Sequence, residues 1–406
     1  MLSAQPIVAP GDAAERARQV RHFVDERILP FEAELAGEPR QAERRMAELS
    51  AAARAAGLWG SFYPPALGGR LDSLRSYLAV AEQEGRSEYA PAIFGDDATL
   101  DLHMLARHAS EDIRRRFLAP LAAGSLVSSY GMSEPDSIGS IPATLSSRAQ
   151  WVDGHWLLTG RKWFICRAAR ASLVTVIART AEGPLEGALS MLLVPSDAPG
   201  FRVERSLSIL GRFSGQGELV FDRVRLPPSH VLGQAGQGLA LMQERLRLGR
   251  VLRSVHWLGL AQRCFDMLCA RIHSPRGRQA RLGDKQLARL RVFQVYQAIA
   301  SARALLQDAA EKYDAGMANS VEVNIAKIAA SQALSLAADS AIQIMGAEGL
   351  SELSPLSGIY RTARTTHILD GTDDALISAV GRQLLDNCGD AGLDFDQPSQ
   401  PARASR

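Results

Sequence analysis

The chain has 406 residues, of which 46% are hydrophobic and 22% charged, and its formal net charge is +2. This length exceeds what one ordinary core accommodates and predicts two or three domains. The nearly balanced charge gives no reason to expect binding to nucleic acid or to a membrane surface. No uninterrupted apolar run approaches 18 residues, so no membrane-spanning helix is expected.

Cysteine and histidine usage argues against a metal or disulfide protein. The four cysteines have no C-x-x-C spacing, which gives no indication of a zinc ribbon or a redox dithiol. His103 and His108 lie five residues apart, whereas two ligands on one helix face would be four apart, so no metal site is expected. Free thiols and the absence of a signal-peptide pattern predict a cytoplasmic protein.

The first part of the chain follows a helical period. Val20, Phe23, Val24 and Ile28 recur at spacings that place them on one apolar stripe. Ser110, followed by two acidic residues, is typical of a helix N-cap. These patterns predict an all-α domain over residues 1–124.

At about Ser125 the period of the apolar residues changes from 3.6 to 2. Six or more short β-like segments follow with turn signals between them, and Asp153-Gly154 is a strong hairpin signal. Such a series without intervening helices implies an antiparallel barrel or sandwich. We assign residues 125–232 to an antiparallel β-barrel domain.

The helical period returns after Pro227. Long helices are expected up to about residue 273, from about 285 to 314, from about 319 to 344, and in a final segment near the end. Four helices with short connections predict a C-terminal four-helix bundle over residues 233–388. Residues 389–406 contain few apolar side chains and are expected to form a disordered tail. The predicted fold class is therefore multidomain α+β.

The most informative stretch runs from 343 to 385. It ends one apolar helix, crosses a loop rich in Ser, Pro and Gly, turns at Asp370-Gly371 and starts a new helix. Thr372 is well placed as the N-cap of that helix, with Asp373 and Asp374 in its first turn. In isolation Asp-Gly is most simply a turn. A carboxylate at a helix entrance can also face a flat ligand.

This stretch resembles the C-terminal signature of the acyl-CoA dehydrogenase family. QIMGAEG, YRTAR and an acid-Gly-Thr nine residues after Arg361 carry the resemblance. It implies that Asp370 is the catalytic base, where the family usually has glutamate, and that Ala347 replaces a usual glycine. An aspartate at this position is similar to the branch that includes the animal acyl-CoA dehydrogenase family members 10 and 11. The resemblance covers nearly the whole chain and implies the same three-domain architecture.

The resemblance also implies FAD as the cofactor. YGMSEP and GRKWFIC are similar to family phrases that face the flavin, with Phe164 and Cys166 where tryptophan and threonine are usual. Without the resemblance, adjacent aromatics in a strand are more simply core residues. The Arg-x-x-Phe-Gly element that meets a neighbouring subunit's flavin is altered, with Leu282 in place of Phe. The implied cofactor residues are Tyr130, Met132, Ser133, Phe164, Ile165, Cys166, Arg278, Gln343, Gly346, Ala347, Thr372 and Asp374.

The substrate-binding residues implied by the resemblance are Ser140, Arg250 and Gly371. Some family members carry the base one residue before the arginine, where this chain has Gly249. The glycine-rich segment 233–238 lacks the lysine and Ser/Thr of a phosphate-binding loop, which argues against nucleotide triphosphate binding. Glu244 is interpreted as a surface acid among arginines.

The expected reaction is α,β-dehydrogenation of an acyl-CoA thioester to a trans-2-enoyl-CoA. Its implied partners are an electron-transfer flavoprotein as electron acceptor and further copies of the chain in a homodimer or homotetramer. Two alternatives stay open. An acyl-CoA oxidase or oxygenating flavoprotein would react rapidly with O₂ once reduced, and a non-catalytic relative would be colourless and take up no FAD.

Overall fold

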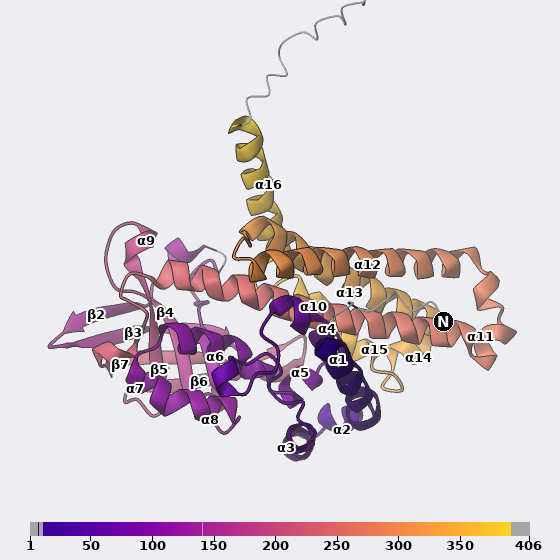
Figure 1. The fold of residues 1–406 in the computed structure, drawn as a ribbon, viewed down its shortest axis with the longest axis horizontal. Coiled ribbons are helices and arrows are strands. Elements are labelled where there is room, and N and C mark those ends of the chain that lie inside the picture. Colours follow the sequence, from indigo (N-terminus) through magenta and orange to yellow (C-terminus); the bar gives the residue numbers. More distant parts are fainter. Residues whose placement is uncertain (1–6, 8–10, 140, 391–406) are drawn as a thin grey trace, which may run out of the picture.

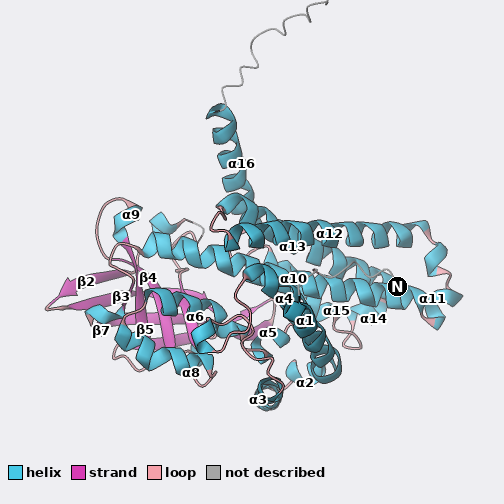
Figure 2. Cartoon of the chain, viewed as in Figure 1, coloured by secondary structure: helices cyan, strands magenta, loops and turns pink. Residues whose placement is uncertain are grey.

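The computed structural model describes residues 7, 11–139 and 141–390. Helices of the N-terminal part lie beside a β-sheet, and long helices of the C-terminal part extend away from that sheet (Figure 1 and Figure 2). This arrangement confirms the predicted three-part α+β fold. Ser140 and residues 391–406 of the expected tail lie outside the described residues, while the last helix continues to Asp390.

The N-terminal part is helical, as predicted. Ser110 caps a helix, because its hydroxyl accepts a hydrogen bond from the amide of Ile113 at 3.4 Å. The α-helices are α1 Gly11–Phe23, α2 Glu32–Leu35, α3 Pro39–Ala55, α4 Leu74–Glu84, α5 Ala90–Ile93, α6 Asp96–His108, α7 Glu111–Ile113 and α8 Ala119–Ala122.

The middle part is an eight-stranded sheet. Its β2–β3 hairpin turns at Asp153 and Gly154, with φ of 48° and 76°, which confirms the predicted hairpin. Its strands are β1 Ser128–Gly131, β2 Arg148–Val152, β3 His155–Ile165, β4 Leu173–Arg179, β5 Leu189–Pro195, β6 Phe201–Ile209, β7 Arg212–Leu226 and β8 Val231–Leu232, with the short helix α9 Leu185–Ala188 before β5.

The sheet differs in detail from the predicted antiparallel barrel. Among the described strands, β1 pairs with β4 and β2 pairs with β4 in parallel, while the other pairs are antiparallel. A parallel pair requires a long connection, and residues 132–172 provide one between β1 and β4. The strand order β6-β7-β3-β2-β4-β5-β8 leaves β6 and β8 at its two ends, so the sheet is mixed and open.

The C-terminal part is a helical bundle, as predicted, with one further helix packed against it. The helix α16 projects away from the others in Figure 1, and Val380 is the last buried side chain among those described in this helix. The helix α15, to which the sequence analysis assigned no helix, packs against α13. The helices are α10 Gly238–His273, α11 Pro275–Gln279, α12 Gln286–Asp314, α13 Ser320–Met345, α14 Ala347–Leu350, α15 Leu356–Thr366 and α16 Asp373–Asp390.

One hydrophobic core joins the N-terminal helices α1, α3 and α4 to the bundle helices α10, α12 and α13. The crossing of α4 and α10 depends on two glycines. A Cβ on Gly85 would lie 2.2 Å from the carbonyl oxygen of His256, and one on Gly259 would lie 2.0 Å from that of Glu82. Only glycine permits this approach. It places the end of α4 against the middle of α10, where the candidate site lies.

Candidate active site

The turn that carries Asp370 has a conformation in which residues other than glycine are uncommon. Asp370 has a φ of 57° and Gly371 a φ of 99°, and left-handed backbone of this kind is enriched at functional sites. The hydroxyl of Thr372 accepts a hydrogen bond from the amide of Ala375 at 3.3 Å, which confirms the predicted N-cap of α16. The sequence therefore folds locally as expected.

Two cations hold the backbone of this turn. Arg250 Nε, from α10, donates to the carbonyl oxygen of Asp370 at 2.8 Å, and Lys327 Nζ, from α13, donates to that of Gly371 at 3.0 Å. A Cβ on Gly371 would lie 3.2 Å from Arg250 Nη2. Arg250, which the resemblance implies in substrate binding, thus contacts the turn of the candidate base.

A network of polar side chains packs against the turn and supports it. Lys327 is fully buried and lies 2.5 Å from Asp373 Oδ1. Asp373 Oδ2 accepts a hydrogen bond from Ser331 at 2.9 Å and lies 2.6 Å from His367 Nδ1. Burial lowers the pKa of Lys327, while its contact with Asp373 opposes that effect. Because these groups satisfy one another, the turn has little freedom to move.

The carboxylate of Asp370 faces Arg253, one turn along α10 from Arg250. Arg253 Nε lies 3.3 Å from Asp370 Oδ2, and the Asp370 side chain is 21% exposed. The negative charge of Asp370 is the main reason that the pKa of Arg253 is raised, with a contribution from Cys166. The end of β3 and the turn before α16 therefore come together at Arg253.

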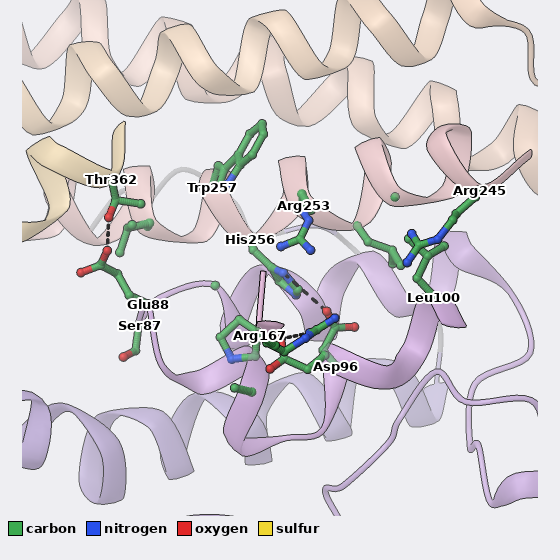
Figure 3. Close-up of a pocket in the computed structure, with 17 residues that line it drawn as sticks. Ser87, Glu88, Asp96, Leu100, Arg167, Arg245, Arg253, His256, Trp257 and Thr362 are labelled. Carbon is green, nitrogen blue, oxygen red and sulfur yellow. Dashed lines mark hydrogen bonds and ion pairs between the residues drawn. The ribbon is translucent and has the colours of Figure 1, made fainter. Parts of the chain in front are cut away.

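Arg253 also lines a cavity of about 230 Å³ between α4, α5, α6, α10 and α15. Ligand pockets typically measure ~300–1,000 Å³, so this cavity suits one part of a ligand. In Figure 3, Arg253 points from α10 toward a group formed by His256, Asp96 and Arg167. The ionisable side chains in its wall are Glu88, Asp96, Asp97, Arg167, Arg245, Arg253 and His256.

Two of the arginines in the cavity wall have close acidic partners. Arg167 Nη1 lies 2.9 Å from Asp97 Oδ1, and its Nε donates to the carbonyl of Ser128 at 3.0 Å. Arg245 Nη2 lies 2.5 Å from Asp101 Oδ1. These contacts connect α6 and α10 to the sheet, and they fix both guanidinium groups in place.

The loop after β1 is held by a buried ion pair. Lys162, from the middle of β3, is fully buried; its Nζ donates to the carbonyl of Met132 at 2.9 Å and to Glu134 Oε1 at 2.7 Å. The amide of Trp163 donates to the carbonyl of Ser133 at 3.0 Å. These three bonds fix Met132 and Ser133 against β3.

The two members of this pair have shifted pKa values. Burial alone would raise the pKa of Glu134, but the charge and hydrogen bond of Lys162 and the amide of Ser146 outweigh it and lower the pKa to about 2. Burial lowers the pKa of Lys162 to about 8, although Glu134 favours its charged form. Both groups are thus charged near neutral pH and depend on each other.

The end of β3 exposes an aromatic ring. The β3–β7 register shifts between Lys162 and Ile165, and Phe164 has a φ of 52°. Such irregularities re-aim side chains beside active sites. Phe164 is 46% exposed and lies against Trp163, with ring centroids 5.0 Å apart. Cys166 is also exposed, whereas the side chain of Ile165 is in the core of the sheet, so Ile165 offers a ligand its backbone alone.

The sheet side of the site fits a flat, polar-edged cofactor such as a flavin. The Oη of Tyr130 is buried and has no hydrogen-bond partner among the described residues, and the guanidinium of Arg245 lies 4.2 Å from its ring centroid. Burial raises the pKa of Tyr130, so its hydroxyl remains a donor. A buried donor without a partner is costly unless a ligand satisfies it. The exposed ring of Phe164 supplies an apolar face on β3.

Four further implied cofactor residues lie at the far end of the bundle. Glu348, beside Gly346 and Ala347, pairs with Arg271 and with Arg276 of α11. Arg253 and Arg271 are separated by 18 residues of α10, roughly 27 Å of helix. One chain therefore does not bring the two groups of residues together. The group at the far end comprises Arg278, Gln343, Gly346 and Ala347, all exposed.

No rival base stands beside Arg250. Gly249 lines the cavity and has no carboxylate, and Glu244 is paired with Arg107 and His108, each at 3.0 Å, as expected of a surface acid. Asp374 is exposed. In the part of the chain that the structure describes, no three His, Cys, Asp or Glu side chains form a candidate metal site, and no helix is long and apolar enough to cross a membrane.

The sequence analysis missed four residues that build the site. They are Glu134, Lys162, Arg253 and Lys327. Lysine occurs at only four positions in a chain with many arginines, and two of these lysines are fully buried beside the site. The scarcity of lysine was the feature of the sequence that could have pointed to Lys162 and Lys327. Nothing in the sequence pattern distinguished Arg253 from the other arginines of α10.

Comparison with known proteins identifies the family. The N-terminal, middle and C-terminal domain models of acyl-CoA dehydrogenases match residues 12–125, 129–224 and 236–385. The "probable acyl-CoA dehydrogenase FadE2" of Mycobacterium tuberculosis is 30% identical over 83% of this chain and 85% of its own length. The chain belongs to the acyl-CoA dehydrogenase family.

Further comparisons show how similar the chain is to individual members of that family. It is 29% identical to human acyl-CoA dehydrogenase family member 11 over 90% of its length, but it spans only about half (49%) of that relative. Glutaryl-CoA dehydrogenase of Desulfococcus multivorans is 29% identical over 87% of this chain and 92% of its own. A solved glutaryl-CoA dehydrogenase in complex with glutaryl-CoA has a TM-score of 0.82 and 26% identity, covering 94% of this chain and 97% of its own.

Proposed function

We propose that the protein is an FAD-dependent acyl-CoA dehydrogenase that converts an acyl-CoA thioester to its trans-2-enoyl-CoA with Asp370 as the base. The observation that carries the proposal is the anchored turn. Asp370 is held by the contacts of Arg250 and Lys327 to the turn carbonyls, and its carboxylate pairs with Arg253, which lines the cavity. A positioned carboxylate close to a cavity that can take part of a substrate is what proton abstraction requires.

Loss of the α-proton is the difficult step. A thioester α-proton is a weak acid, so the negative charge that develops on the thioester must be stabilised by fixed dipoles and charges. Arg250 and Lys327 place two positive charges beside the turn without moving. Asp370 takes the proton, the β-carbon loses a hydride, and the electron pair of the α C–H bond forms the new double bond.

The hydride requires an acceptor, and the chemistry that FAD supplies when bound is acceptance of this hydride. Tyr130, Met132, Ser133, Phe164 and Cys166 are the residues of this chain that would hold its flavin. Lys162 and Glu134 would position them by fixing the loop after β1 to β3. Thr372 caps α16 and so fixes the start of that helix directly after the turn.

The proposal also includes two kinds of partner, further copies of the chain and an electron-transfer flavoprotein. Leu287 and Phe293 of α12 are 75% and 60% exposed, which favours a homodimer or homotetramer. The cofactor residues at the far end of the bundle would then serve the flavin of another copy. An electron-transfer flavoprotein would reoxidise the enzyme. The four cysteines are free thiols, which agrees with a cytoplasmic location.

Anaerobic mixing of the FAD-loaded protein with a panel of acyl-CoA thioesters tests the function. We expect at least one thioester to bleach the flavin absorbance and to yield the enoyl-CoA, identified by mass spectrometry as a product two hydrogens lighter. A protein that binds FAD but is bleached by no thioester, or that takes up no FAD, contradicts the proposal. Rapid reoxidation by O₂ would instead assign the oxidase class.

A further inference from the structure

The wall of the cavity is more polar than a plain hydrocarbon chain requires. Arg253, Arg167, Asp96 and Asp97 all line it. Placing CH₂ groups against ionised side chains removes water from those charges and returns nothing. A fatty acyl chain without substituents is therefore a poor occupant. The cavity of about 230 Å³ has room for the short end of an acyl group.

Arg253 differs from the other two arginines of the wall. Arg167 and Arg245 have acidic partners at 2.9 and 2.5 Å that belong to no candidate chemistry. In the described part of the chain, Asp370 is the one carboxylate in ion-pair contact with Arg253, at 3.3 Å, while Asp97 and Asp96 act on its charge from farther away. Its side chain is 49% exposed. The guanidinium that faces the cavity is thus held by the base itself.

This contact conflicts with the proposed role of Asp370. While Asp370 Oδ2 lies beside Arg253 Nε, that oxygen is not free to approach the α-proton of a substrate. When Asp370 moves to the substrate, the guanidinium of Arg253 loses its close partner, and a group of the substrate that can accept its hydrogen bonds can take that place. An arginine has five donors and no acceptor. The replacement must therefore be an oxygen acceptor.

A second observation places a buried imidazole with long polar contacts in the same cavity. His256 lines it and is only 11% exposed, and its Nε2 has no hydrogen-bond partner among the described residues. The carboxylate of Glu84 is 3.5 Å from that nitrogen, and Asp96 Oδ2 is 3.9 Å from Nδ1. His256 is one turn of α10 beyond Arg253, so both face the same space (Figure 3).

We propose that Arg253 is the specificity residue of the site and that it selects acyl-CoA thioesters whose acyl chain carries an oxygen acceptor. The acceptor, a carboxylate or a hydroxyl, binds the Arg253 guanidinium in place of Asp370, and this exchange releases Asp370 for the α-proton. His256 is the second polar contact. The inference rests on the proposed function for the role of Asp370, but the selection itself is a statement about binding.

Binding can be measured apart from the reaction with CoA thioethers, which lack an acidic α-proton. The probes are S-pentyl-CoA, S-(5-hydroxypentyl)-CoA and S-(4-carboxybutyl)-CoA, which have the same number of carbons in the chain. Their dissociation constants for the FAD-loaded full chain would be obtained by isothermal titration calorimetry. We expect at least one of the two oxygenated probes to bind about tenfold or more tightly than S-pentyl-CoA, as charged hydrogen bonds contribute.

Variants assign that preference to Arg253. Arg253→Met should remove it, Arg253→Lys should keep part of a preference for the carboxylate, and Arg247→Met, on the same helix but outside the cavity wall, should leave it unchanged. The hydroxyl and carboxylate probes separate the two possible substituents. Equal binding of all three probes by the native protein, or a preference that survives in Arg253→Met, overturns the proposal.

The reaction supplies an independent readout. On pentanoyl-CoA, which has no substituent to take Arg253, Arg253→Met should reduce the flavin faster than the native protein, because its Asp370 is already free. A slower or unchanged rate contradicts the exchange. If no thioester reduces the flavin in either protein while the binding preference is present, the proposed function fails and the selectivity stands.

Discussion

The two regions that flank the candidate site are each anchored by a buried lysine, but their acidic residues have different roles. At the loop after β1, buried Lys162 holds Glu134 and the carbonyl of Met132. At the turn before α16, buried Lys327 holds Asp373 and the carbonyl of Gly371. In each case a lysine fixes a loop by one acid and one backbone oxygen. The candidate base, however, stands outside the anchoring network, whereas Glu134 is the anchor itself.

Asp370 is proposed to act in the reaction, whereas Glu134 stabilises the fold. Asp370 is held through its backbone, and among the described residues its carboxylate has one ion-pair partner, Arg253 at 3.3 Å. Changing that carboxylate leaves the contacts that shape the turn. Glu134 instead accepts from Lys162 and from the amides of Ser146 and Ser147, so changing it removes support from the loop. The two regions should therefore respond to mutation in opposite ways.

The largest effect is expected for Asp370→Asn. Asparagine keeps the size of the side chain and the N-cap beside it, but it cannot accept the proton. The rate of flavin reduction should fall by about 10²–10⁴-fold or more, with FAD content and melting temperature unchanged. Stopped-flow absorbance measures the rate, and Asp386→Asn, an exposed acid on α16, is the control. Bleaching at the native rate would exclude Asp370 as the base.

The opposite response is expected for Glu134→Gln. It leaves the ammonium of Lys162 buried without a counter-charge, which typically costs about 3–5 kcal/mol of unfolding free energy. Adding Lys162→Met should recover much of the loss, because the double variant has no buried charge, while the one carbonyl oxygen of glutamine still accepts from one of the two serine amides. Urea unfolding monitored by circular dichroism gives both values. A single variant as stable as the native protein would show that the pair does not anchor the loop.

Asp370→Glu tests how rigidly the turn is held. Glutamate is the usual family residue, and it extends the carboxylate by roughly 1.5 Å, a displacement of a size that can cost about 10²-fold in rate. Because Arg250 and Lys327 fix the backbone, the turn cannot retract to compensate, and we expect a loss of that order. The rate of flavin reduction on the best thioester of the panel is the measurement. A gain would show a site still shaped for glutamate.

Much of the fold followed from local pattern, because local pattern reports local structure. The hairpin at Asp153 and the N-cap at Thr372 depend on backbone preferences of the residues themselves, and both were predicted. The pairs Lys162–Glu134 and Lys327–Asp373 join residues 28 and 46 positions apart. No short-range period encodes such pairs. Arg253 differs from its neighbours only because the turn of Asp370 packs against it.

The smallest expected effect is a loss of folding stability at acidic pH. The folded-state pKa of Glu134 is lowered to about 2, whereas an unpaired glutamate titrates near ~4.3. Between these values the unfolded chain binds more protons than the folded one, so the contribution of Glu134 to stability is complete above about pH 4.3 and is lost as the pH falls toward 2. The double variant Glu134→Gln with Lys162→Met lacks both groups. Urea unfolding at pH 5.5 and at pH 3 should therefore show the native protein losing more stability than this variant. Equal losses would mean that Glu134 titrates alike in both states, and the loop after β1 would then be held by its backbone, as the turn of Asp370 is.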